Sequence, residues 1–188
     1  MATESDCGQP TDVELVHQTR KGDPSAFHEL MDRHAPTLFA LAVALSGHAA
    51  DAEDIVQETF AGAFRGLGTF QGRATVKTWL TRILIRQTAR HHRAARKHKT
   101  TLVSLTETSH SDACGPSPQS AADARMDVTA AIKTLGPEHR EVVMLREIQG
   151  LSYEAMAEIL EIPRGTVESR LFRARRELQK RLKEYLGS

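Results

Sequence analysis

The 188-residue sequence has little of what enzymes, secreted proteins and membrane proteins usually carry. Its two cysteines, Cys7 and Cys114, lie in polar segments and lack the spacing of a disulfide framework or a zinc site. Aromatic residues make up only 5% of the chain, which disfavours sheet architectures because strands are rich in them. The longest apolar run, residues 38–45, is too short to span a bilayer, and the acidic N-terminus is unlike a signal peptide. These absences predict a cytoplasmic protein.

The motifs of common enzyme chemistry are also missing. The sequence contains no Gly-rich phosphate loop, no His-Glu-x-x-His and no Gly-x-Ser-x-Gly. His91, His92 and His98 lack the carboxylate or thiolate companions of a metal site. We therefore expect no enzyme activity, no catalytic residue, no metal and no cofactor.

Charge is segregated, although the formal net charge is only +1. One acidic block lies in residues 51–58 and a second in residues 138–161, whereas Lys and Arg gather in residues 73–99 and 164–183. Separate basic and acidic segments in a chain whose net charge is close to zero are typical of a protein that binds two kinds of partner.

Helical spacing dominates the chain, and no segment requires a strand. We predict an all-α fold of two small helical domains joined by a flexible linker, the C-terminal domain being a helix-turn-helix. The predicted boundaries are a disordered tail at 1–10, an N-terminal domain at 11–99, a linker rich in Ser, Thr, Pro, Gly and Ala at 100–124, and a C-terminal domain at 125–188.

Several local details follow from the N-terminal sequence. Ser25 is expected to cap a helix, and Pro36 to kink or restart it. In the next helix, from about residue 50 to 65, one stripe is expected to hold Val56, Phe60 and Phe64, together with Ala63 and Leu67.

The helix expected at residues 75–99 has two unlike faces. One face is a stripe that should be buried, formed by Val76, Trp79, Leu80, Ile83 and Leu84. We therefore expect the Trp79 ring to pack in the core and not to stack on nucleic-acid bases. Nine Lys and Arg residues lie between residues 73 and 99 without one acidic residue among them. Since like charges repel one another, a polyanionic partner explains this helix better than simple solvation does.

Residues 150–182 are typical of a helix-turn-helix. Ser152 is expected to cap the first helix, and Pro163 and Gly165 mark the turn. The second helix is expected to bury Val167 and Leu171 and carries many arginines on its other sides. The second helix of such a motif enters the major groove of DNA. An amphipathic hairpin with a solvated basic face is the alternative.

The order of these segments resembles a bacterial sigma factor of the extracytoplasmic-function (ECF) type. DAEDIVQETFAGAF (residues 51–64) is similar to the polymerase-binding helix of that family. Residues 69–97 resemble its loop and helix for the −10 promoter element, and residues 135–178 its helix-turn-helix for the −35 element. The resemblance implies a subunit that binds core RNA polymerase, directs it to promoter DNA, assists melting, and is usually held by an anti-sigma factor.

The resemblance also assigns residues. Those expected to bind polymerase are Asp54, Gln57 and Glu58. Those expected at the −10 element are Phe70, Arg73, Lys77, Arg82, Arg86 and Arg90. Those expected at the −35 element are Arg164, Thr166, Glu168, Ser169, Arg170 and Arg173.

Glu168 departs from the family, because many relatives carry a basic residue there. Its carboxylate has two equally supported roles: it accepts a hydrogen bond from a cytosine amino group, or it pairs with Arg164 one turn earlier.

Two other functions stay open at this point. A free-standing helix-turn-helix regulator would leave the acidic helix at residues 51–64 unexplained. A helical adaptor for a protein partner would leave the segregation of charge unexplained.

Overall fold

The computed structural model describes residues 9–102 and 130–186, with side chains placed for residues 9–94 and 130–183. Four helices build the first part of the chain: α1 (Asp12–Arg20), α2 (Pro24–Ser46), α3 (Ala49–Gly66) and α4 (Val76–Leu102), with the short turn η1 (Leu67–Thr69) before α4. The second part holds α6 (Pro137–Val143), the wider turn η2 (Met144–Ile148), α7 (Tyr153–Leu160) and α8 (Arg164–Leu186). The described residues contain no strand, and the all-α prediction is confirmed.

Local signals explain where the first helices begin. The Thr11 hydroxyl accepts from the Glu14 N–H at 3.3 Å, while the Glu14 carboxylate accepts from the Thr11 N–H at 2.7 Å. This reciprocal pair satisfies backbone groups that the first turn of α1 leaves unbonded. Helix α2 is capped by Asp23, with Pro24 in its first turn, so the expectation that Ser25 is the cap was wrong by two residues.

Helix α2 continues through Pro36 without restarting. Pro36 lies on the exposed side of the helix, whereas Leu30, His34 and Leu38 are buried on the other side. Packing of that buried side stabilises the helix on both sides of the proline and offsets the missing N–H. His34 also forms a 2.8 Å contact with Asp12 that holds α1 against α2.

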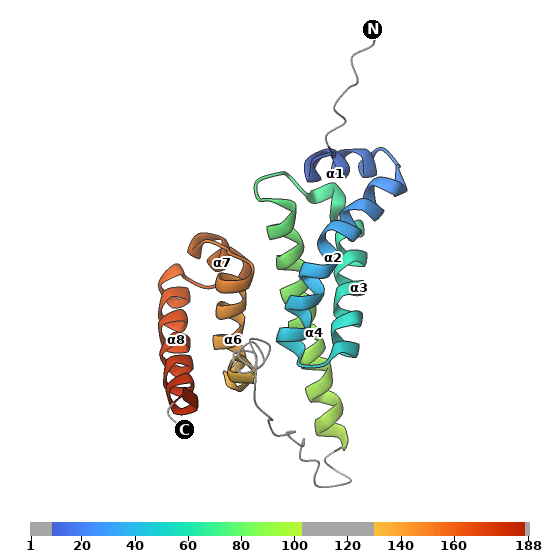
Figure 1. Cartoon of the computed structure of the whole chain (residues 1–188). Coiled ribbons are helices and arrows are strands. Elements are labelled where there is room, and N and C mark those ends of the chain that lie inside the picture. Colours follow the sequence, from blue (N-terminus) through green and yellow to red (C-terminus); the bar gives the residue numbers. More distant parts are fainter. Residues whose placement is uncertain (1–8, 103–129, 187–188) are drawn as a thin grey trace.

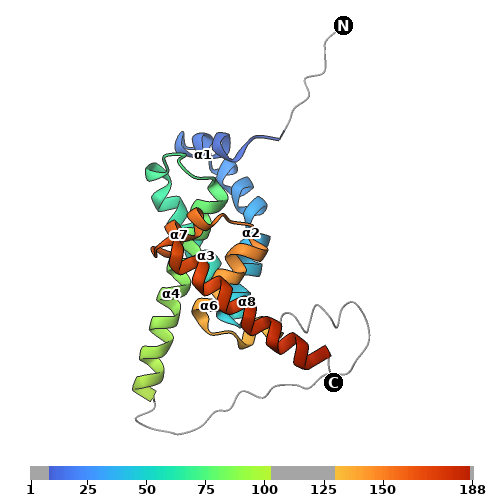
Figure 2. The same ribbon diagram turned by 90° about the vertical axis from the view of Figure 1, so that its left-hand side faces the viewer.

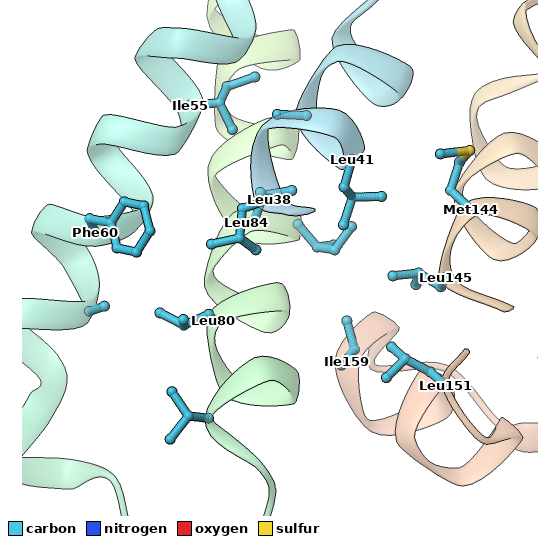
Figure 3. Close-up of a cluster of buried hydrophobic side chains, with 14 of the residues drawn as sticks. Leu38, Leu41, Ile55, Phe60, Leu80, Leu84, Met144, Leu145, Leu151 and Ile159 are labelled. Atoms are coloured by element: carbon cyan, nitrogen blue, oxygen red, sulfur yellow. The ribbon is translucent and has the colours of Figure 1, made fainter. Parts of the chain in front are cut away.

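The core of the first part lies between α2, α3 and α4. Leu38 and Leu41 of α2 meet Ile55 of α3 and Leu84 of α4, and each is at most 2% exposed (Figure 3). The predicted stripe of α3 was correct at Phe60 but wrong at Phe64, which is 57% exposed. The position it missed is Ile55, which is 2% exposed.

The second part packs against α2 and α4. Figure 1 shows α6 and α7 beside these helices, with α8 outermost and α3 on the far side of the molecule. Buried residues of both parts belong to one continuous apolar cluster. Helices α4 and α7 contact each other, and the rotated view of Figure 2 shows α7 in front of the helices of the first part.

Three sequence expectations lie outside the described residues. They are the disordered tail for residues 1–8, most of the linker at 103–124, and the first turns of the C-terminal domain at 125–129.

We expect Leu84→Ala to lower the free energy of unfolding by about 2–5 kcal/mol, because it leaves a cavity in a fully buried site. Val13→Ala is the matched control: Val13 is 63% exposed, and its truncation should cost less than about 0.5 kcal/mol. Urea denaturation followed by circular dichroism measures both. Equal small losses in the two variants would contradict the core described above.

Candidate functional site

The acidic face of α3 is open to solvent. Asp54, Gln57 and Glu58 are exposed, while the opposite face of the helix packs through Ile55 and Phe60. The three residues follow helical spacing, so they form one contiguous polar surface. The structure thus brings the predicted polymerase-binding residues together.

A shallow hollow separates this acidic surface from the basic helix. Asp54 and Glu58 line it from α3, and Gln87, Arg90 and His91 line it from α4. Arg90, predicted at the −10 element, is exposed here and contacts Gln87 at 3.4 Å. Opposite charges therefore face one another across the groove between the two helices.

The loop between α3 and α4 is fixed by a residue that sequence reasoning missed. The Arg20 guanidinium donates to the carbonyl of Leu67 at 2.6 Å and also to the carbonyl of Phe70. No motif in α1 indicates this contact, which joins positions far apart in the sequence. The Phe70 ring is 8% exposed and packs on Trp79 with 5.0 Å between ring centroids. Trp79 is thus part of the packing, as predicted, and Phe70 joins it.

A second hollow opens beside this loop. Its walls come from the loop, from α4 and from one residue of α7, namely Thr69, Phe70, Gln71, Arg73, Ala74, Trp79, Arg82, Ile83, Arg86 and Glu158. Aromatic rings and guanidinium groups together are what a single nucleic-acid strand requires. Arg73 is exposed at the rim.

Three of the predicted −10 cations face the second part of the chain. Lys77 donates from Nζ to the Gln149 carbonyl at 3.0 Å, Arg82 pairs with Glu158, and Arg86 pairs with Glu161. The sequence predicted a basic surface available to a polyanion, and the structure shows these cations in contact with α7 and the turn before it.

The helix-turn-helix has the predicted form. The Ser152 hydroxyl accepts from the Ala155 N–H at 3.1 Å and caps α7. Glu161 ends that helix with φ of 56°, in the left-handed region. Helix α8 follows directly after Pro163 and buries Val167, Leu171 and Ala174.

The predicted −35 residues lie along the first half of α8. Arg164, Glu168, Ser169 and Arg173 are exposed, whereas Thr166 and Arg170 are partly buried. The Ser169 hydroxyl donates to the Thr166 carbonyl at 3.0 Å.

Two of these residues, Arg164 and Glu168, pair with each other. The Arg164 Nε lies 2.8 Å from Glu168, and its Nη1 lies 2.5 Å from Glu154 of α7. The hydrogen bond that Arg164 donates to Glu168 and the charge of Glu154 raise the pKa of Arg164 above its ordinary value. Of the two roles expected for Glu168, the structure contains the pairing with Arg164. Base recognition by Glu168 stays a prediction.

Arg170 pairs with Glu138 of α6 at 2.8 Å. Near this pair lies the half-buried carboxyl of Glu141, which sequence reasoning missed. Burial raises the pKa of Glu141 to about 7, and the nearby Arg170 charge opposes the rise only in part. Within the described residues, no cluster of His, Cys, Asp or Glu is arranged to hold a metal ion.

Comparison with known proteins decides the family. Residues 30–98 match Sigma-70 region 2, and residues 125–178 match Sigma-70 region 4. The RNA polymerase sigma-H factor of Pseudomonas aeruginosa is 35% identical over 95% of this chain and 97% of its own length. The ECF RNA polymerase sigma-E factor of Salmonella typhimurium is 34% identical over 93% of this chain and 95% of its own length.

The chain belongs to the ECF group of sigma-70 factors. Sigma factors direct RNA polymerase to promoters and are initiation factors, not enzymes. The ECF assignment and the predicted function are thereby confirmed.

Solved sigma-factor structures share the fold. The sigma factor RpoE of Bartonella quintana, crystallised with the anti-sigma factor NepR, has a TM-score of 0.70 and 30% identity, covering 84% of this chain and 96% of that one. CnrH, solved with the cytosolic domain of CnrY, has a TM-score of 0.66 and 26% identity, covering 92% and 97%. No described helix of this sigma factor is both long and apolar enough to cross a membrane.

The raised pKa of Glu141 predicts how the stability of this sigma factor depends on pH. Below about pH 4.5 the carboxyl is protonated in both the folded and unfolded states, so its burial costs nothing. Between pH 4.5 and about 7 the Glu141 carboxyl ionises only in the unfolded state, so the free-energy cost of burying it grows with pH. Above about pH 7 it is ionised in both states and this cost is constant. Glu141→Gln removes the penalty.

We therefore expect Glu141→Gln to leave the free energy of unfolding nearly unchanged at pH 4 and to raise it at pH 8. The gain at pH 8 is at most about 3 kcal/mol, because partial exposure of the side chain reduces the cost of ionisation. Urea unfolding at the two pH values measures it. A gain of equal size at both would show that the carboxyl is not the cause.

Proposed function

We propose that this sigma factor docks on core RNA polymerase through Asp54, Gln57 and Glu58. The observation that carries the proposal is the division of charge between helices: α3 exposes carboxylates, whereas α4 and α8 expose cations. A rigid acidic surface on one helix suits a basic protein partner, because complementary charge steers association and fixes register.

The loop and α4 hold the −10 element as a single strand. The hollow beside the loop presents the exposed guanidinium of Arg73 next to the packed rings of Phe70 and Trp79, and Lys77, Arg82 and Arg86 extend the cationic surface along α4. Such a surface favours the separated non-template strand over the closed duplex and so assists melting. Arg90 continues this surface toward the acidic face of α3.

Helix α8 recognises the −35 element as duplex DNA. Its exposed first half carries Arg164, Glu168, Ser169 and Arg173, the placement that a recognition helix has in the major groove. Arginine forms bidentate hydrogen bonds to guanine, and the contacts to phosphate fix the register. Thr166 and Arg170, which are partly buried, support this surface from its edge.

The two recognition surfaces belong to separate domains, at residues 11–99 and 125–188, joined by the linker at 100–124. The protein acts in the cytoplasm, where the polymerase is. Its partners include an anti-sigma factor, since the structures of RpoE with NepR and of CnrH with CnrY are among those that share this fold.

Glu58→Lys tests the polymerase-binding surface. Reversing an exposed charge places like charges together in the complex, so we expect affinity for core polymerase to fall at least about tenfold, which is about 1.4 kcal/mol. Asp32→Lys on α2 is the matched control, because Asp32 is also an exposed acid and the change in charge is the same.

Fluorescence titration with purified core polymerase measures the affinities, and run-off transcription on promoter templates measures the consequence. Wild-type protein and Asp32→Lys should both support start-site-specific transcripts, and Glu58→Lys should not at limiting concentration. Equal core affinity in the two variants would remove α3 as the docking surface.

A further inference from the structure

The side chain of Arg20 joins the ends of three helical segments. Arg20 is the last residue of α1, and its guanidinium donates from Nε to the Leu67 carbonyl at 3.0 Å. Its Nη2 donates to the same carbonyl at 2.6 Å and also to the Phe70 carbonyl. Leu67 is the C-cap residue of α3, and Phe70 is the C-cap residue of η1. One side chain of α1 therefore closes the ends of both segments that lead into the loop before α4.

The chemistry of a guanidinium suits this position. The last carbonyls of a helix have no partner further along the helix, and the helix dipole makes them attractive to a cation. A guanidinium presents its N–H groups in one plane and at fixed spacing, so it can hold two carbonyl oxygens in one relative position. An ammonium is a point charge on a flexible chain and cannot fix that position. Arginine at residue 20 thus sets geometry as well as supplying charge.

Phe70 is held at its backbone and at its side chain by different partners. Arg20 binds its carbonyl, while its ring is 8% exposed and packs on Trp79 with 5.0 Å between ring centroids. Figure 1 shows the loop before α4 at the same end of the molecule as α1, and α1 and η1 contact each other. Phe70 is therefore a fixed point at the start of the loop, and α1 supplies one of its two anchors.

The other end of the loop is fixed as well. The Thr75 hydroxyl accepts from the Thr78 N–H at 3.1 Å, where α4 begins. Residues 71–74 connect the two anchors, with Gly72 at φ of 70°, in the left-handed region that favours glycine. The residues of this connection that line the hollow beside the loop are Gln71, Arg73 and Ala74. A connection of four residues between two fixed ends has few conformations available, so its polar groups keep defined positions.

Defined positions matter for selecting a base more than for holding a strand. Contacts with phosphate supply most of the affinity and are much the same for every sequence. Discrimination between bases needs donors and acceptors at fixed places, and a displacement of about 1 Å is enough to weaken it. Loss of the anchor at Phe70 should therefore reduce selectivity and leave most of the affinity for a strand in place.

We propose that Arg20 is a positioning residue for −10 recognition, whose bonds to the Leu67 and Phe70 carbonyls hold residues 71–74 in the arrangement that selects a base of the non-template strand. This inference rests on the proposed function of the loop and α4. Arg20 lies on α1, outside the basic helix and outside the loop, and acts on the strand through Phe70. Because Arg20 is itself exposed, a direct contact with phosphate is the alternative that the experiment must separate.

Tryptophan fluorescence tests the anchor without DNA. Trp79 is the only tryptophan of the chain, and it packs on Phe70, so its emission reports on the start of the loop. Arg20→Gln should move the emission to longer wavelength and increase quenching by acrylamide, because Phe70 no longer covers the indole. Arg20→Lys, which keeps the charge and loses the planar fork, should change the emission in the same direction. Lys21→Gln is the matched control, since Lys21 is the neighbouring exposed cation, and it should keep the wild-type spectrum.

Strand selection by the holoenzyme tests the consequence. The probe is a pool of 15-nucleotide single-stranded DNA of random sequence, incubated with core polymerase that carries each variant. Retained strands are sequenced, and those retained by core polymerase alone are subtracted. Wild type and Lys21→Gln should enrich a short motif whose best-defined base is favoured about tenfold, as for one good base contact. Arg20→Gln and Arg20→Lys should lose most of this enrichment, while the total amount of bound strand changes less than about twofold.

Three results overturn the inference. The first is full enrichment in both Arg20 variants, and the second is lost enrichment with an unchanged Trp79 spectrum. The third is equal weakening for all sequences, with the slope of log affinity against log salt concentration reduced by about 1, which is the signature of a phosphate contact by Arg20 itself. If circular dichroism shows that Arg20→Gln has lost its helices, Arg20→Lys alone decides.

Failure of the proposed function has a different signature. In that case the wild-type holoenzyme enriches no motif beyond what core polymerase alone retains, and the role of Arg20 falls with it. If the wild type selects a motif and the Arg20 variants select it equally well, only the role of Arg20 is wrong. The two failures are therefore distinguishable in one set of selections.

Discussion

Helix α4 is the element on which the rest of the structure depends, because it must satisfy two kinds of neighbour at once. One face supplies Leu80 and Leu84 to the core with α2 and α3. The other face carries Lys77, Arg82 and Arg86, and close cations repel one another unless anions lie near them. In the free protein these anions are Glu158 and Glu161 of the same chain. In a transcription complex, we propose, they are the phosphates of the −10 strand.

The competition between carboxylate and phosphate couples the two domains. A ligand that binds α4 only when α7 is displaced favours the form of the chain in which α4 and α7 are apart. The size of the shift is set by the difference between its affinities for the separated form and for the packed form. The exposed acidic face of α3 allows polymerase to bind either form. We propose that strand binding and the packing of the two parts are in this way linked through α4.

The sequence predicted the helices and the charge segregation well, because periodicity and sign are local properties. In the predicted stripe of α4, Val76, Leu80 and Leu84 are buried and Trp79 and Ile83 are partly buried, and the turn at Pro163 was placed correctly. It failed at Phe64, which is exposed, and the helix does not restart at Pro36; packing between helices decides both outcomes. It also missed the Arg20 bonds to the loop, which no pattern in α1 indicates. The pairing of α4 with α7 was also missed: acidic and basic blocks were both visible, but helical spacing cannot tell which blocks will meet.

The central claim is that the cationic face of α4 exchanges α7 for nucleic acid during initiation. Energy transfer between donor and acceptor dyes on residues 37 and 179 tests it most directly when measured for the free chain, with core polymerase, and with core polymerase on promoter DNA. The account predicts high transfer efficiency in the free chain and a clear fall in the promoter complex. An efficiency that stays the same while transcription proceeds would show that α7 never leaves α4, and would contradict the account.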